Sequence, residues 1–139
     1  MENKEFKNII NELLKPLGFK NKGNYWRLET DEIEKVINLQ KSNYSNLYYF
    51  NYGYNLNNLD YDKVTMHVFG RLSQSEVFDL ENDLDSTIRI KKIIEIINIE
   101  LLPKLKRINS ESDILDLLKG RPHLNDIPIK VKEYLKLKD

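Results

Sequence analysis

Apolar residues recur every three to four positions near the start of the chain. They form one stripe of a predicted α-helix: Phe6, Ile9, Ile10, Leu13, Leu14 and Leu17. Pro16 and Gly18 mark the end of this helix, because glycine tolerates the left-handed backbone that often follows a last helical turn. We expect a turn around Gly23 and Asn24 to come next.

Two short stretches after this turn have the character of β-strands. Residues 25–29, YWRLE, are rich in aromatic and branched side chains. Residues 33–41 alternate, with Lys35 interrupting an apolar parity that is formed by Ile33, Ile37 and Leu39. The polar step between the two stretches is short enough for a hairpin, so we expect two antiparallel strands.

The next two stretches alternate over a longer run. Residues 46–56 place aromatic side chains and a leucine on one parity, namely Tyr48, Phe50, Tyr52, Tyr54 and Leu56. Asn51, Gly53 and Asn55 occupy the other parity. Residues 64–72 alternate in the same way, with Val64, Met66, Val68, Gly70 and Leu72 on one side and Thr65, His67, Phe69 and Arg71 on the other. Alternate side chains of a strand point to opposite faces, so each stretch predicts a strand with two different faces.

The remainder of the chain is predicted to be helical. After an acidic connector over residues 73–85, a helix is expected from about Asp85 to Arg107, with an apolar stripe of Ile90, Ile93, Ile94, Ile97, Leu101 and Leu105. Pro103 should kink or split this helix, because its ring blocks a backbone hydrogen bond one turn earlier. Ser110 begins a capping sequence for a short helix through residue 119, and Pro128 can take the first position of a last helix.

The order of the predicted elements is therefore α-β-β-β-β-α-α-α. Strands grouped together and then helices grouped together are typical of an α+β fold with an antiparallel sheet. A length of 139 residues is that of one domain. We expect residues 1–139 to form a single α+β domain, with helices packed on the aromatic face of a four-stranded antiparallel sheet.

If the aromatic parity packs against helices, the opposite face of the sheet is polar. It would carry amides, two arginines and a histidine drawn from all four strands: Arg27, Asn38, Gln40, Asn51, Asn55, His67 and Arg71. Such a set can donate and accept hydrogen bonds, and the planar fork of an arginine suits a carboxylate. Two interpretations stay open, an ordinary solvated surface and a face that recognises a partner.

Charge and composition limit the classes of molecule that we expect this protein to bind. Twenty-two basic residues balance twenty-two acidic ones, which disfavours a general nucleic-acid or membrane-surface binder. No apolar run approaches the length of a membrane span, and the N-terminal MENKEFKNIINELL lacks the apolar core of a signal peptide. The chain has no cysteine, which excludes disulfides and fits a reducing compartment. We expect a cytoplasmic protein with neither a membrane nor a nucleic acid as its partner.

No sequence motif for catalysis or cofactor binding is found. The five glycines are scattered and match no phosphate-binding loop. His67 and His123 are far apart, and neither has a second ligand at helical spacing, so we expect no zinc site. No catalytic residue is assigned and no cofactor is expected.

The acidic connector contains alternating carboxylates: Asp79, Glu81, Asp83 and Asp85. The spacing is like the start of a calcium-binding loop, but Leu84 stands where that loop needs glycine and Ile90 where it needs the closing acid. We therefore expect no metal here. The tract is a second candidate binding surface, because many toxin domains that act on nucleic acid are basic.

Three ordered strings resemble a bacterial family, the domain of unknown function 4304. They are LLKPLGFKNKGNYWRL, VINLQKSNYSNLYYFNYGYNL and HVFGRL, and the resemblance covers about residues 6–72. Members show a similar helix end, a strand around INLQKS, an aromatic-asparagine-aromatic-glycine strand and a short string that ends in arginine. Tyr52 stands where a smaller aliphatic residue is more usual. The resemblance implies no activity, but some small bacterial proteins of this general kind look like immunity proteins of toxin systems.

These observations lead to one leading hypothesis and two alternatives. The leading hypothesis is a small, cytosolic, non-catalytic module that binds another protein, in one form an immunity protein of a bacterial toxin system. The first alternative is an enzyme that acts on a nucleic acid or phosphate ester, with Arg27, His67 and Arg71 as anion ligands. The second is a structural or regulatory partner. The missing catalytic motifs favour the leading hypothesis.

Overall fold

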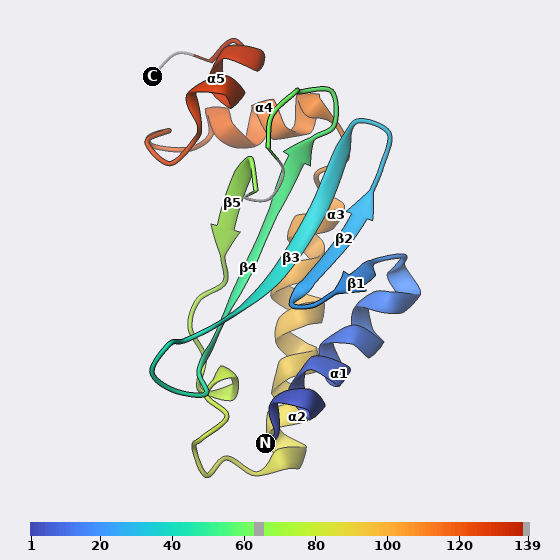
Figure 1. Ribbon diagram of the computed structural model, residues 1–139, viewed down its shortest axis with the longest axis vertical. Coiled ribbons are helices and arrows are strands. Elements are labelled where there is room, and N and C mark those ends of the chain that lie inside the picture. The colour runs from blue at the N-terminus through green and yellow to red at the C-terminus, as the bar shows by residue number, and fades with distance from the viewer. Residues whose placement is uncertain (63–65, 138–139) are drawn as a thin grey trace.

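The computed structural model describes residues 1–62 and 66–137, and its centre is one antiparallel sheet (Figure 1). The strands lie side by side in chain order: β1 (Lys20–Lys22), β2 (Tyr25–Glu29), β3 (Ile33–Lys41), β4 (Tyr48–Leu56) and β5 (Val68–Arg71). The predicted α+β class and the antiparallel sheet are confirmed. The predicted number of strands is wrong, because the described part of the chain contains five strands in this sheet and not four.

The additional strand is β1, which lies in the segment predicted to be a turn. Lys20, Asn21 and Lys22 are all exposed, so no alternation of apolar and polar residues marks them as a strand. Residues 23 and 24 form a two-residue loop that folds β1 back onto β2 and pairs Lys22 with Tyr25. Gly23 has a φ of 60°, a backbone conformation that glycine adopts without steric cost. Backbone pairing, and not side-chain burial, therefore makes this strand.

β5 is shorter than the predicted fourth strand, which ran from residue 64 to residue 72. Val64 and Thr65 lie outside the described residues. His67 does not join the ladder, because its backbone N–H donates to the side-chain oxygen of Asn55 and not to a backbone carbonyl. The strand therefore begins at Val68, and its pairing with β4 runs from there to Arg71.

The helices follow the sequence pattern closely. They are α1 (Asn3–Leu14), α2 (Ser86–Ile96), α3 (Leu102–Lys106), α4 (Glu111–Lys119) and α5 (Ile129–Tyr134), with short 3-10 turns η1 (Lys15–Leu17) and η2 (Glu76–Phe78) and a π-helical segment η3 (Ile97–Leu101). Gly18 ends the first helical segment with a φ of 95°, as predicted. Pro128 is the N-cap of α5 and not its first residue, because its ψ of 143° is extended. Among the described residues, no helix is both long and apolar enough to cross a membrane.

Pro103 divides the long helix as predicted, and the π-helical segment η3 lies at the division between α2 and α3. The ring nitrogen of proline cannot donate to the carbonyl one turn earlier. The chain just before it widens into η3, where the N–H of Leu102 donates to the carbonyl of Ile97. The helical axis continues into α3, so the apolar stripe stays on the sheet side through Ile97, Leu101 and Leu105.

The core lies between the helices and the aromatic face of the sheet. α1, α2 and α3 lie behind the sheet in Figure 1, and none of the helices in the described residues covers its front face. Phe6 of α1 packs against Tyr48 with ring centroids 5.0 Å apart, and the hydroxyl of Tyr54 donates to the carbonyl of Lys104 in α3 at 3.1 Å. The predicted packing face is confirmed, although Tyr52 is only partly buried.

The stripe of the long helix can be tested by the same substitution at two positions. Ile93 is fully buried, whereas Ile99 is 70% exposed. We expect Ile93→Ala to lower the free energy of unfolding by about 2–5 kcal/mol, because it removes buried methyl groups and leaves a cavity. Ile99→Ala should change it by about 0.5 kcal/mol or less. Urea denaturation measures both, and equal losses would contradict the packing described here.

Lys35 interrupts the apolar parity of β3 because it lies on the covered face. The residue is 6% exposed, and its Nζ donates to the side-chain oxygen of Asn109 at 2.8 Å, just before α4. Burial lowers the pKa of this ammonium group from 10.5, while the nearby carboxylate of Asp113 opposes that shift. The side chain thus crosses the edge of the core and ties β3 to the start of α4.

This buried lysine makes a prediction about pH. Between the lowered folded-state pKa and 10.5, the unfolded chain binds more protons than the folded chain, so stability contributed by Lys35 rises with pH in that window. We expect Lys35→Met to be more stable than the native protein at neutral pH, with the difference shrinking as the pH approaches 10.5. Thermal melts across pH measure this. Lys41→Met, at the exposed end of the same strand, should show no such trend.

Candidate functional site

The uncovered face of the sheet carries a connected group of polar side chains at its centre. Asn38, Asn51 and Arg71 lie opposite one another on β3, β4 and β5. The Nδ2 of Asn51 donates to the oxygens of Asn38 and Gln40, both at 3.1 Å. Asn51 is only 3% exposed, so these bonds fix the amide in one orientation.

Arg71 completes this group. Its Nε donates to the Oδ1 of Asn51 and its Nη2 donates to the Oε1 of Gln40, both at 2.8 Å. Its guanidinium lies over the ring of Tyr49, with the central carbon 4.5 Å from the ring centroid. We name these five residues, Asn38, Gln40, Tyr49, Asn51 and Arg71, the amide–arginine cluster.

The charge of Arg71 is not neutralised by the residues that hold it. Amide oxygens and an aromatic face support the guanidinium, and no carboxylate among the described residues lies within ion-pair distance of it. The Nη1 of Arg71 donates to no other residue of the cluster. Arg71 is therefore a positioned cation with donors left for another molecule.

Arg27 belongs to a different group on the same face. Its Nη1 contacts the Oε1 of Glu34 at 2.8 Å, and the same oxygen accepts from the Nδ2 of Asn55 at 3.0 Å. This ion pair neutralises Arg27, and two strands separate β2 from β5. The structure thus brings together four of the predicted binding residues, Asn38, Gln40, Asn51 and Arg71, and leaves Arg27 apart from them.

His67 does not lie on the open face as predicted. It is 1% exposed, and its Nδ1 accepts the backbone N–H of Leu56 at 3.0 Å. Its Nε2 lies 2.9 Å from the carbonyl of Asp62, so a proton on Nε2 satisfies both contacts at once. The ring therefore fastens the loop between β4 and β5 to the end of β4, and it is not placed to contact a ligand.

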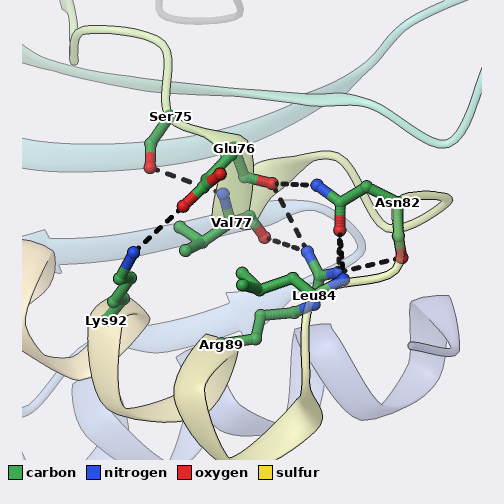
Figure 2. Close-up of polar contacts among 7 residues, drawn as sticks. All are labelled: Ser75, Glu76, Val77, Asn82, Leu84, Arg89 and Lys92. Atoms are coloured by element: carbon green, nitrogen blue, oxygen red, sulfur yellow. Dashed lines mark hydrogen bonds and ion pairs between the residues drawn. The ribbon is translucent and has the colours of Figure 1, made fainter.

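The acidic connector is organised by Arg89, which sequence reasoning missed. Arg89 is 1% exposed and reaches from α2 into the connector (Figure 2). Its Nη1 donates to the carbonyls of Val77 and Asp79 at 2.9 and 2.8 Å, and its Nη2 donates to the side chain of Asn82. The signal for this role is its spacing, because residue 89 lies four positions before Ile93 on the buried stripe.

Three of the four predicted acidic residues have structural partners. Asp85 caps α2 by accepting the N–H groups of Thr87 and Ile88. Asp79 accepts the N–H of residue 81 within the connector, and Glu81 accepts the N–H of residue 46 at 3.1 Å. Asp83 is exposed. These contacts stabilise the turn of the connector itself. The acidic residues therefore have a structural role as well as forming an acidic surface.

No metal centre is assembled from the described residues. Among them, no three His, Asp or Glu side chains lie grouped so that they could hold an ion. His123 is exposed in the segment between α4 and α5.

The family model described as "Domain of unknown function (DUF4304)" matches residues 10–107. The chain belongs to this family. The match covers the sheet, α2 and α3, so it extends well past the residues that carry the resemblance in the sequence, and it leaves α4 and α5 outside. No curated protein and no solved structure matches the chain. The family description assigns no activity, so function is argued from the site.

The role of Arg89 can be tested without touching the sheet. Arg89→Met removes the donor to several carbonyls of the connector, and each buried carbonyl left without a partner costs about 1–3 kcal/mol. We expect a loss of at least about 2 kcal/mol in the free energy of unfolding. Backbone amides in residues 77–82 should also exchange faster with deuterium.

Lys92→Met is the matched control on the same helix. Lys92 forms an exposed ion pair with Glu76 at 3.0 Å, and such pairs contribute about 1 kcal/mol or less. If both variants lose the same stability and leave exchange in the connector unchanged, Arg89 does not hold it.

Proposed function

We propose that this protein is a non-catalytic binding module whose open sheet face recognises an acidic segment of another protein. The observation that carries this proposal is Arg71, a cation fixed by neutral groups and without a carboxylate partner among the described residues. A carboxylate of a partner would supply the missing charge in bidentate geometry.

The amide–arginine cluster supports binding because its geometry is set before a partner arrives. Two hydrogen bonds and a stacked ring hold the guanidinium, so little side-chain entropy remains to be lost on association. Gln40 and Arg71 are exposed, and Asn51 beneath them is buried. Arginine and tyrosine at the centre of a face are also the residue types that dominate the binding energy of many interfaces.

The chemistry of the cluster favours recognition over bond cleavage. It consists of amides, a phenol and a guanidinium, none of which is an ordinary general base at neutral pH. Glu34, a carboxylate on the same face, is engaged with Arg27 and Asn55. His67 is buried against backbone atoms. The proposal of an enzyme with Arg27, His67 and Arg71 as joint anion ligands receives no support from this arrangement.

The test uses the native protein as bait, followed by calorimetry on each captured protein. We expect Arg71→Gln to weaken binding at least about tenfold, since losing a charge-assisted contact at an interface costs about 2–5 kcal/mol. Gln40→Ala should weaken it as well, because it releases the guanidinium. Raising the salt concentration should weaken binding to the native protein more than to Arg71→Gln.

Lys22→Gln is the matched control, because Lys22 is an exposed cation on the same side of the sheet, on the far edge strand β1. It should change affinity less than about twofold, a small fraction of the effect of a central contact. Binding that survives Arg71→Gln but is abolished by charge reversal at Asp79, Glu81 and Asp83 would move the surface to the acidic connector. Unfolding of Arg71→Gln would make the cluster a structural feature.

A further inference from the structure

A cleft lies on the other side of β5, between the sheet and the helices α3 and α4. It has a volume of about 250 Å³, and it is lined by parts of β4, β5, α3, α4 and the segments that follow both helices. Three of its ten lining residues are basic, namely Lys104, Arg107 and Arg121, and none is acidic. In a chain with equal numbers of acidic and basic residues, this is a concentration of positive charge.

Two of the three cations, Lys104 and Arg107, have no carboxylate partner among the described residues. Arg121 lies 3.4 Å from a half-exposed carboxylate of Asp126, and its Nη2 donates to the carbonyl of Phe69 at the outer edge of β5. The contact with β5 holds Arg121 at the cleft, and its ion-pair partner Asp126 is half exposed to solvent.

The remaining wall of the cleft is largely apolar. The ring of Tyr52 lies against Gly70, where an added Cβ would come within 2.6 Å of the ring, so the absence of a side chain at position 70 permits this packing. Val68 and Leu117 extend the same wall, and Leu117 is 36% exposed. Burial raises the pKa of the Tyr54 hydroxyl, which therefore stays a neutral donor to the carbonyl of Lys104.

We propose that this cleft binds a phosphate monoester that carries an aromatic ring. Three cations that line one cleft suit a dianionic phosphate better than a single carboxylate, and arginine forks match phosphate oxygens. The ring of the ligand packs on Tyr52 and Leu117, as planar groups do in sites that combine apolar walls with a few charged side chains. Arg71 does not line this cleft, because Val68 and Gly70 face it while Arg71 faces the open side and borders a neighbouring hollow with Lys104 and Arg107.

The experiment titrates the full chain with phenyl phosphate and follows backbone amide resonances by NMR. We expect shifts at Gly70, Arg107 and Leu117, and a dissociation constant at least tenfold lower than for phenol or for inorganic phosphate. Phenol that binds as tightly as phenyl phosphate would overturn the role of the cations. Inorganic phosphate that binds as tightly would overturn the role of the apolar wall. Shifts confined to other regions would overturn the location.

The second part of the experiment measures phenyl phosphate binding to variants that lack one or two of the positive charges. Lys104→Gln and Arg107→Gln should each weaken phenyl phosphate binding at least threefold, and the double variant at least tenfold. Both residues are exposed, so the melting temperature should hardly change. Lys106→Gln is the matched control, because Lys106 lies two residues along the same helix and lines a different hollow. A loss with Lys106→Gln equal to that with Lys104→Gln would reduce the effect to net charge and overturn the site.

Arg71→Gln separates this proposal from the proposed function. It should leave phenyl phosphate binding within twofold of the native value, while it weakens the binding of an acidic partner. Loss of phenyl phosphate binding with Arg71→Gln would place the anion on the open face and overturn the cleft as its site.

Discussion

The pairing of β3 with β4 is the constraint on which the rest of this molecule depends. The ladder runs from Ile33 opposite Leu56 to Lys41 opposite Tyr48 without a bulge. Side chains alternate along a strand, so a shift by one residue would exchange the two faces completely. In the observed register, aromatic and aliphatic residues meet the helices, while Asn38 meets Asn51 on the open side. The register of this one strand pair therefore determines which side chains enter the core and which form the amide–arginine cluster.

β5, at the edge of the sheet, likewise presents different side chains to the two faces. Its alternation sends Phe69 and Arg71 to the open face and Val68 and Gly70 to the helix side. A single short strand therefore forms part of two different surfaces, one flat and hydrogen-bonded, the other hollow and basic. Arg71, Lys104 and Arg107 also share a neighbouring hollow with Glu100, so positive charge continues around the end of the strand.

Two positively charged side chains, Lys35 and Arg89, are buried in this fold. Lys35 and Arg89 each interrupt an apolar pattern, and each reaches oxygen atoms at the margin of the core. The two terminal nitrogens of Arg89 donate to backbone carbonyls and to the amide side chain of Asn82, and none of these acceptors is a carboxylate. Each residue adds polar contacts to a segment that also packs on the core, namely the start of α4 for Lys35 and the acidic connector for Arg89.

Local patterns determined the helices, the aromatic face and the amides of β3 and β4, because helical and strand periodicities depend on residues close in sequence. They missed β1, whose exposed residues form a strand only by pairing with β2. The sequence patterns also grouped Arg27 and His67 with Arg71. The alternation along a strand predicts the face on which a side chain lies, but it does not predict which atoms the side chain contacts. Only the tertiary structure paired Arg27 with Glu34, turned His67 onto Leu56 and left Arg71 without a carboxylate partner in the described part of the chain. Those partners come from other strands and loops, and their choice depends on distances that the order of residues along the chain does not contain.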